Sequence, residues 1–165
     1  MTPVTSPIVL HAVVLAICSG SPTPAAPPSS YPVTHVWEGV VSSIVDGNGL
    51  FVAGVEVRLQ GIAAPEDNAR RRDRGGREAT EALRRLALKQ RVTCYADGTR
   101  SRQRIIARCE LPGGQDLGEE LVRAGLARDC PRYFLGDYAA SEALARRDGT
   151  DLSRIYALPS YCRRR

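Results

Sequence analysis

The chain has 165 residues, 43% of them hydrophobic and 25% charged, a composition that excludes wholesale disorder and allows about one ordinary domain. No apolar run reaches the roughly 18–20 residues needed to cross a bilayer, so a polytopic membrane protein is excluded. The formal net charge is +5 and every lysine and arginine lies from Arg58 onward, so a polyanionic partner is one class that the charge favours.

The chain opens with an apolar stretch. Residues 8–18 are apolar apart from His11, and small residues and five prolines follow up to Pro32. This order predicts a signal peptide or leader over residues 1–20 and a Pro/Ser-rich linker over residues 21–33, and hence a secreted or periplasmic protein with no transmembrane segment in the mature chain. A buried strand or a disordered tail is the alternative. A lipid anchor through Cys18 ranks below plain export, because Ile17 stands where a small residue is expected.

Three strands are predicted at the start of the remaining domain, which we place at residues 34–165. Residues 36–45 are rich in valine and suit a long strand, and the Asp-Gly-Asn-Gly sequence at residues 46–49 is a turn signal. Residues 50–52 resume a strand. Residues 55–59 alternate apolar and polar side chains, which is typical of a half-buried strand.

The spacing of apolar residues then changes from the period of a strand to that of a helix. Apolar residues recur at helical spacing over residues 77–90. Two strands are predicted around Cys94 and Cys109, with a turn between them. Asp116 is typical of the N-cap of a second helix, and a third helix is expected over residues 137–147. The order favours an α+β fold, a small closed five-stranded barrel with three helices.

Four cysteines remain if the leader is removed: Cys94, Cys109, Cys130 and Cys162. An even number agrees with export, and four cysteines allow three pairings. In the predicted hairpin Cys94 and Cys109 are near-opposite, close enough for a cross-strand disulfide. Free buried thiols and a zinc site are the alternatives. The absence of a Cys-x-x-Cys spacing, with His35 as the one histidine after the leader, disfavours zinc.

The order of several motifs resembles the staphylococcal nuclease (thermonuclease) family. The two main motifs are VDGNGL at residues 45–50 and VRLQGIAAPE at residues 57–66, and the resemblance continues through RIIA at 104–107, DLG at 116–118 and LVRAGLA at 121–127. It covers roughly residues 36–147. It implies an OB-fold barrel of five strands with three helices, and hydrolysis of phosphodiester bonds in DNA and RNA with calcium.

The resemblance also implies roles for individual residues. Arg58 and Arg104 match catalytic arginines that contact the scissile phosphate, and Glu66 matches the carboxylate that positions or deprotonates the attacking water. Two guanidinium groups offset developing phosphoryl charge, and a carboxylate orients the nucleophile. Arg102 and Tyr133 stand at positions where the family pattern implies substrate binding.

The calcium positions depart from the family pattern. Asn48 and Ala63 replace the two metal carboxylates. The backbone carbonyl of Ala64 matches a main-chain ligand, and Asp46 matches an acid that stands further from the ion. Calcium prefers several oxygens, including carboxylates, so its affinity should fall severely. We expect no cofactor, or calcium if the site still functions.

Three functions are compatible with these residues. We rank first an exported, catalytically impaired nuclease homologue that binds nucleic acid or another polyanion through arginines, as a monomer. The alternatives are a working phosphodiesterase with a weak or rearranged metal site, and a non-enzymatic exported scaffold. The lost ligands favour the first and third readings, whereas the retained Arg58, Glu66 and Arg104 favour the first and second.

Overall fold

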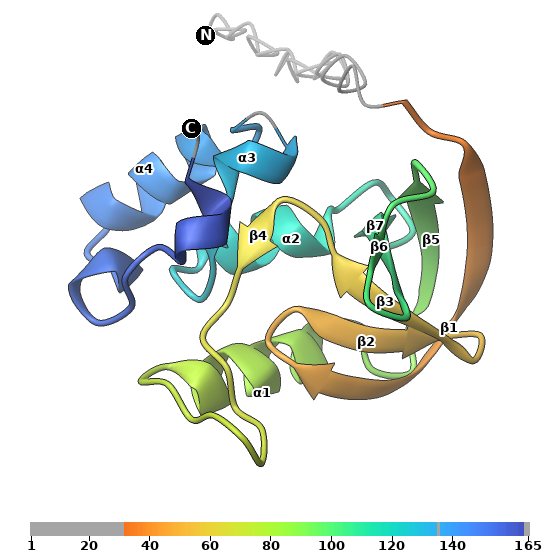
Figure 1. Cartoon of the computed structure of the whole chain (residues 1–165), viewed down its shortest axis with the longest axis horizontal. Coiled ribbons are helices and arrows are strands. Elements are labelled where there is room, and N and C mark those ends of the chain that lie inside the picture. The colour runs from red at the N-terminus through yellow and green to blue at the C-terminus, as the bar shows by residue number, and fades with distance from the viewer. Residues whose placement is uncertain (1–31, 135, 164–165) are drawn as a thin grey trace, which may run out of the picture.

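The computed structural model describes residues 32–134 and 136–163 (Figure 1). The predicted leader at residues 1–20, Cys18 and most of the predicted linker lie outside the described residues. In chain order the elements are β1 (His35–Asp46), β2 (Gly49–Val52), β3 (Val55–Leu59), β4 (Ile62–Ala63), α1 (Gly76–Ala87), β5 (Arg91–Ala96), β6 (Arg100–Ser101), β7 (Arg104–Glu110), α2 (Leu117–Arg123), β8 (Arg128–Asp129), α3 (Pro131–Phe134), α4 (Ala139–Arg147) and the short 3-10 helices η1 (Leu152–Arg154) and η2 (Ser160–Cys162).

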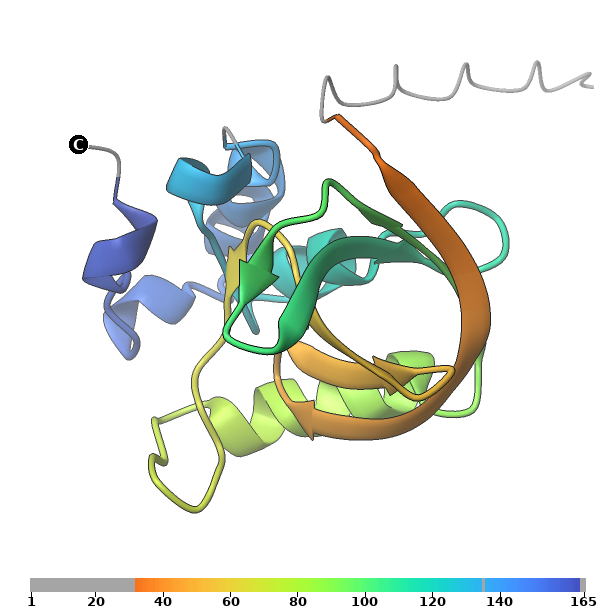
Figure 2. The same cartoon turned by 45° about the vertical axis from the view of Figure 1, so that its right-hand side comes forward.

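The main sheet closes into a barrel, as Figure 2 shows. β1 is long enough to serve two neighbours, because its first half pairs with β5 and its second half with β2, both antiparallel. The sheet continues from β2 to β3 on one side and from β5 to β7 on the other, through antiparallel pairs. Parallel pairing of β3 with β7 closes the ring. The predicted α+β fold with a five-stranded OB-type barrel is confirmed.

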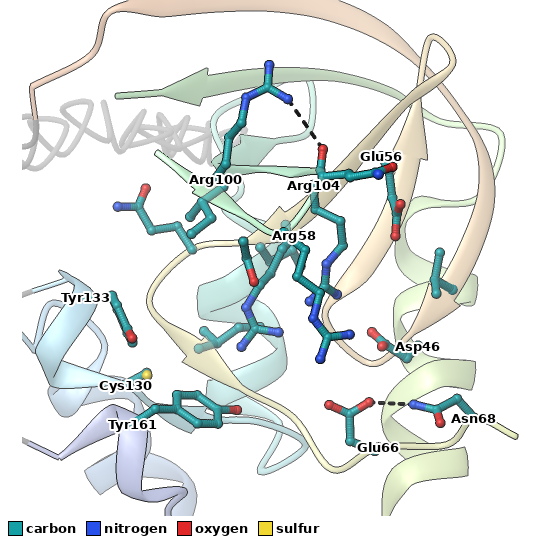
Figure 3. Close-up of a pocket in the computed structure, with 18 of the residues that line it drawn as sticks. Asp46, Glu56, Arg58, Glu66, Asn68, Arg100, Arg104, Cys130, Tyr133 and Tyr161 are labelled. Atoms are coloured by element: carbon teal, nitrogen blue, oxygen red, sulfur yellow. Dashed lines mark hydrogen bonds between the residues drawn. The ribbon is translucent and has the colours of Figure 1, made fainter. Parts of the chain in front are cut away.

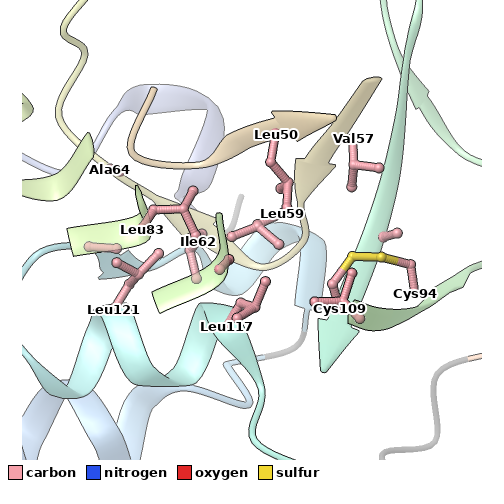
Figure 4. Close-up of a cluster of buried hydrophobic side chains, with 14 of the residues drawn as sticks. Leu50, Val57, Leu59, Ile62, Ala64, Leu83, Cys94, Cys109, Leu117 and Leu121 are labelled. Atoms are coloured by element: carbon pink, nitrogen blue, oxygen red, sulfur yellow. A yellow bond between two sulfur atoms is a disulfide. The ribbon is translucent and has the colours of Figure 1, made fainter. Parts of the chain in front are cut away.

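Apolar side chains from the barrel and from two helices form one core (Figure 4). Leu50, Val57 and Leu59 point into it from β2 and β3, and Leu83 of α1 and Leu117 of α2 meet them. All five are at most 2% exposed. Helix α1 therefore buries the face that its apolar spacing predicts.

The helix boundaries differ from those predicted for local backbone reasons. Helix α1 ends at Ala87 rather than at residue 90, because Leu88 is extended and Lys89 has a left-handed φ of 66°. Asp116 caps α2 as expected, accepting from the backbone N–H groups of Gly118 and Glu119. The predicted third helix is α4, which begins at Ala139. The four-residue α3 was not predicted.

Two disulfides cross-link the described residues. Cys94 and Cys109 face each other in the β5–β7 register and are bonded, so the predicted cross-strand bridge is present. The second bond joins Cys130, directly before α3, to Cys162 in η2. Two disulfides are compatible with a secreted or periplasmic location. Within residues 32–134 and 136–163, no helix combines the length and apolarity required to span a membrane.

Candidate functional site

A pocket of about 920 Å³ opens on one side of the barrel (Figure 3). Strand β3, the turn between β6 and β7, the loop after Pro65, and the segments around Cys130 and Tyr161 all contribute to its lining. The lining includes six arginines and three acidic residues, so its balance is positive. The arginines are Arg58, Arg70, Arg71, Arg100, Arg102 and Arg104, and the acids are Asp46, Glu56 and Glu66.

Arg58 and Arg104 enter this pocket from the two strands that close the barrel. Arg58 lies on β3 between the buried residues Val57 and Leu59, so strand alternation turns its side chain away from the core. Arg104 begins β7, which runs parallel to β3 in the register Arg58↔Ile106. Figure 3 shows both guanidinium groups on the same side of the barrel, facing Glu66.

Glu66 lies opposite the arginines in the loop before α1. Its backbone N–H donates to an Asp73 carboxylate oxygen at 3.2 Å, and Asn68 Nδ2 donates to its Oε2 at 2.8 Å. Partial burial raises the pKa of Glu66, and the nearby charge of Asp46 raises it further, while Arg58 and Arg104 act in the opposite direction. The Glu66 carboxyl therefore interacts electrostatically with Asp46, Arg58 and Arg104, which the sequence motifs assign to the same site.

A glycine makes this loop geometry possible. A Cβ at Gly76, the first residue of α1, would collide with the backbone carbonyl of Glu66. The Glu66 backbone also accepts from the N–H of Asp73 at 2.8 Å. The close contact between the loop and the helix start therefore fixes the direction in which Glu66 enters the pocket.

The residues at the expected calcium positions already have protein partners. Asn48 is 2% exposed, and its Oδ1 accepts a 2.7 Å hydrogen bond from Arg58 Nη1. The Ala64 carbonyl accepts from the Tyr156 hydroxyl at 3.1 Å. Burial raises the pKa of Tyr156, which keeps its hydroxyl protonated and able to donate. Asp46 Oδ1 accepts from the Asn48 backbone N–H at 3.0 Å within the turn.

This donor set does not fit a calcium ion. Calcium takes six to eight oxygens, and its protein sites rely on carboxylates. Ala63 offers no side-chain oxygen, and the Asn48 amide oxygen already accepts a hydrogen bond from the positively charged Arg58 guanidinium, which occupies the side where a metal ion would need it. Within the part of the chain that the structure describes, no group of three His, Cys, Asp or Glu side chains could hold a metal ion.

The two predicted substrate-binding residues line the pocket at its rim. Arg102 lies in the turn after β6 with a left-handed φ of 60° and is exposed. Tyr133 extends from α3 and is 49% exposed. The structure thus brings together Arg58, Glu66 and Arg104, with Arg102 and Tyr133 at the edge, whereas Asn48 and Ala64 lie outside the lining.

Sequence reasoning missed two tyrosines near the chain end. Tyr156 covers the Ala64 carbonyl, and Tyr161 lines the pocket with its ring centroid 6.0 Å from the Arg58 guanidinium carbon. Neither belongs to a periodic element. The one available signal was Cys162 beside Tyr161, because a disulfide there fixes the terminal residues in space.

The family match with known proteins covers the part of the barrel from β3 onward and all six arginines of the pocket. A family model described as staphylococcal nuclease homologue matches residues 56–152. Succinoglycan biosynthesis protein ExoI of Rhizobium meliloti (strain 1021) is 29% identical over 120 residues, which is 68% of this chain and 63% of that protein. The chain therefore spans less than two thirds of the length of this curated relative. Tyr156, Tyr161 and Cys162 lie beyond the family match.

Proposed function

Since the chain belongs to the family of staphylococcal nuclease homologues, we propose that it binds nucleic acid or another polyanion in the arginine-lined pocket and lacks calcium-dependent hydrolysis. The observation that carries the proposal is the hydrogen bond from Arg58 to Asn48. In this bond Arg58, one of the two arginines expected to bind phosphate, donates to Asn48, which replaces a calcium ligand of the family. The same contact favours anion binding and disfavours cation binding.

The charge of the pocket supports polyanion binding. Six arginines against three acids leave an excess of fixed positive charge around a cavity large enough for a segment of polymer. Guanidinium groups make bidentate contacts with phosphate oxygens. With Arg58 and Arg104 on one wall, a phosphate group could contact both at once.

The remaining catalytic group does not by itself replace a metal. Glu66 can still orient or deprotonate a water, and its raised pKa suits a group that exchanges protons. In the family, however, the ion supplies charge stabilisation of several kcal/mol in the transition state. Without a fitting donor set, we expect hydrolysis to be slow or absent.

We also propose that the domain works outside the cytoplasm. Its two disulfides form and persist in oxidising compartments. The relative is named for succinoglycan biosynthesis, so carbohydrate polymers belong among the probes beside nucleic acid.

The direct test is binding measured by fluorescence anisotropy with a labelled single-stranded oligonucleotide, over a salt series, in EDTA and in calcium. We expect affinity to fall steeply as salt rises, because phosphate contacts release counterions. Arg104→Ala should weaken binding and reduce the salt slope by roughly one. Arg85→Ala removes the same charge from the exposed surface of α1, away from the pocket, and should leave both unchanged.

Two results would overturn the proposal. Failure to bind any polyanion at low salt, nucleic acid or acidic polysaccharide, would favour the scaffold function. Rapid cleavage of DNA or RNA that requires calcium and is lost in Arg58→Ala would establish a working phosphodiesterase.

A further inference from the structure

Residues 152–163 pack beside the pocket and contribute Tyr161 to its lining. Leu152, Tyr156 and Cys162 pack with Ala63 and Cys130 in a small apolar cluster of their own, separate from the barrel core. The Cys130–Cys162 disulfide closes this cluster covalently. The residues from η1 to η2 are thereby held against β4, next to the arginines.

The segments joined by this disulfide present two tyrosine rings to the pocket. Tyr161 directly precedes Cys162, and Tyr133 lies one turn after Cys130, so the disulfide ties both rings to one point. Both remain accessible, at 41% for Tyr161 and 49% for Tyr133. Figure 3 shows the tyrosines on one side of the pocket, with Cys130 between them, and Arg58 and Arg104 facing them.

The position of Tyr161 does not follow from core packing. Its neighbour Cys162 is fully buried, as is most of Tyr156, whereas the Tyr161 ring stays exposed in the pocket. The ring lies near the Arg58 guanidinium, with 6.0 Å between the ring centroid and the guanidinium carbon. An exposed aromatic face beside a phosphate-binding cation suits a ligand that carries a flat ring next to an anionic group.

We propose that Tyr161 is a specificity-determining residue, which stacks on a nucleobase of single-stranded nucleic acid while Arg58 holds the adjoining phosphate. This inference rests on the proposed function and assigns a role to a residue outside the family match. Base faces are open in a single strand and hidden in a duplex, and acidic polysaccharides have no flat aromatic face. The tyrosine thus favours nucleic acid over other polyanions.

The test compares three probes at matched salt: a thymidine oligonucleotide, an abasic oligonucleotide of the same length and charge, and a sulfated polysaccharide. The unmodified protein should prefer the thymidine oligonucleotide to the abasic one by roughly five- to 150-fold, the range typical of one stacked base. Tyr161→Leu should abolish that preference and leave the affinity for the abasic oligonucleotide unchanged, while Tyr161→Phe should retain it. Tyr95→Leu is the matched control, since Tyr95 also lies beside an arginine, Arg108, but outside the pocket.

Each other outcome contradicts the inference in a recognisable way. If Tyr161→Leu weakens both oligonucleotides equally, the ring only supports Arg58. If the polysaccharide binds as tightly as the thymidine oligonucleotide, base stacking does not set the specificity. In either case Arg104→Ala would still weaken binding of all three probes, so the proposed function would stand. Failure of all probes to bind would remove the proposed function itself.

Discussion

Arg58 illustrates how one side chain changes the chemistry of a site. Its 2.7 Å hydrogen bond to Asn48 joins a guanidinium to a neutral amide oxygen where the family pattern has a carboxylate. The amide accepts the hydrogen bond without adding negative charge, so Arg58 keeps its positive charge available for an anion. We therefore expect the exchange of a carboxylate for an amide to weaken metal-ion binding and to favour anion binding at the same time.

Restoring the carboxylates tests this interpretation. We expect Asn48→Asp alone to give no calcium binding, because Arg58 would pair with the new carboxylate. Asn48→Asp combined with Ala63→Asp should bind calcium in isothermal titration calorimetry and raise calcium-dependent cleavage at least about tenfold, since a bound ion supplies several kcal/mol of charge stabilisation. Ala63 is fully buried, so a thermal melt must first establish that the double variant folds. A folded double variant that binds no calcium would contradict this account.

Glu66 predicts a pH dependence of binding. Burial and Asp46 raise its pKa, so the carboxyl takes up a proton at a higher pH than an ordinary glutamate. The charged form repels phosphate and the protonated form does not. Affinity for a thymidine oligonucleotide, whose bases do not protonate in mild acid, should therefore rise as pH falls through the titration of Glu66.

The matched variant for this prediction is Glu66→Gln. It should bind more tightly at neutral pH and lose most of the increase in acid, when anisotropy is measured at constant ionic strength. An unchanged pH profile in Glu66→Gln would show that another group controls the dependence.

At the scale of elements, the two disulfides have different tasks. The Cys94–Cys109 bond joins neighbouring strands that backbone hydrogen bonds already hold. The Cys130–Cys162 bond spans a sequence separation of 32 and anchors two short 3-10 helices that pack only in the small apolar cluster around this bond, outside the barrel core. The second bond therefore controls the position of a segment, and the first chiefly stabilises a sheet.

Removing each bond should separate these tasks. Cys130→Ser with Cys162→Ser should lower the free energy of unfolding by about 2–4 kcal/mol and reduce oligonucleotide affinity, because Tyr161 and Tyr156 lose their anchor. Cys94→Ser with Cys109→Ser should cost comparable stability but leave the affinity of the folded protein unchanged. Urea unfolding and anisotropy measure the two effects. Equal loss of affinity in both variants would argue against a local role for the second disulfide.

The sequence predicts the regular elements well for a physical reason. Val57 and Leu59 alternate with polar neighbours, and Leu83 recurs at helical spacing, so each pattern reflects burial of one face. The predicted end of α1 is three residues too late, because the spacing of apolar residues does not reveal the left-handed backbone at Lys89. The small β4–β8 sheet and α3 are too short to carry any period.

For the whole molecule, the sequence indicates which residues belong to the pocket but not what they contact. The sequence assigns Arg58, Glu66 and Arg104 to one site only through the order of the family motifs that contain them. The bond from Arg58 to Asn48 and that from Tyr156 to Ala64 depend on tertiary positions, and the second joins residues 92 positions apart. Tyr161 could not be placed from sequence, because the Cys130–Cys162 bond that anchors it joins segments with no periodic pattern to show where they lie relative to the pocket.

The parallel pairing of β3 with β7 positions the two arginines independently of the residues expected to bind a metal ion. Backbone hydrogen bonds between β3 and β7 fix the positions from which the Arg58 and Arg104 side chains leave the sheet. The expected metal ligands lie elsewhere, at Asn48 in the turn after β1 and at Ala63 and Ala64 in and after β4. Substitutions in those two connections can abolish metal affinity while the spacing of the paired cations stays intact. On the proposed function, phosphate binding would therefore depend on the barrel wall and would persist in a homologue that no longer hydrolyses its ligand.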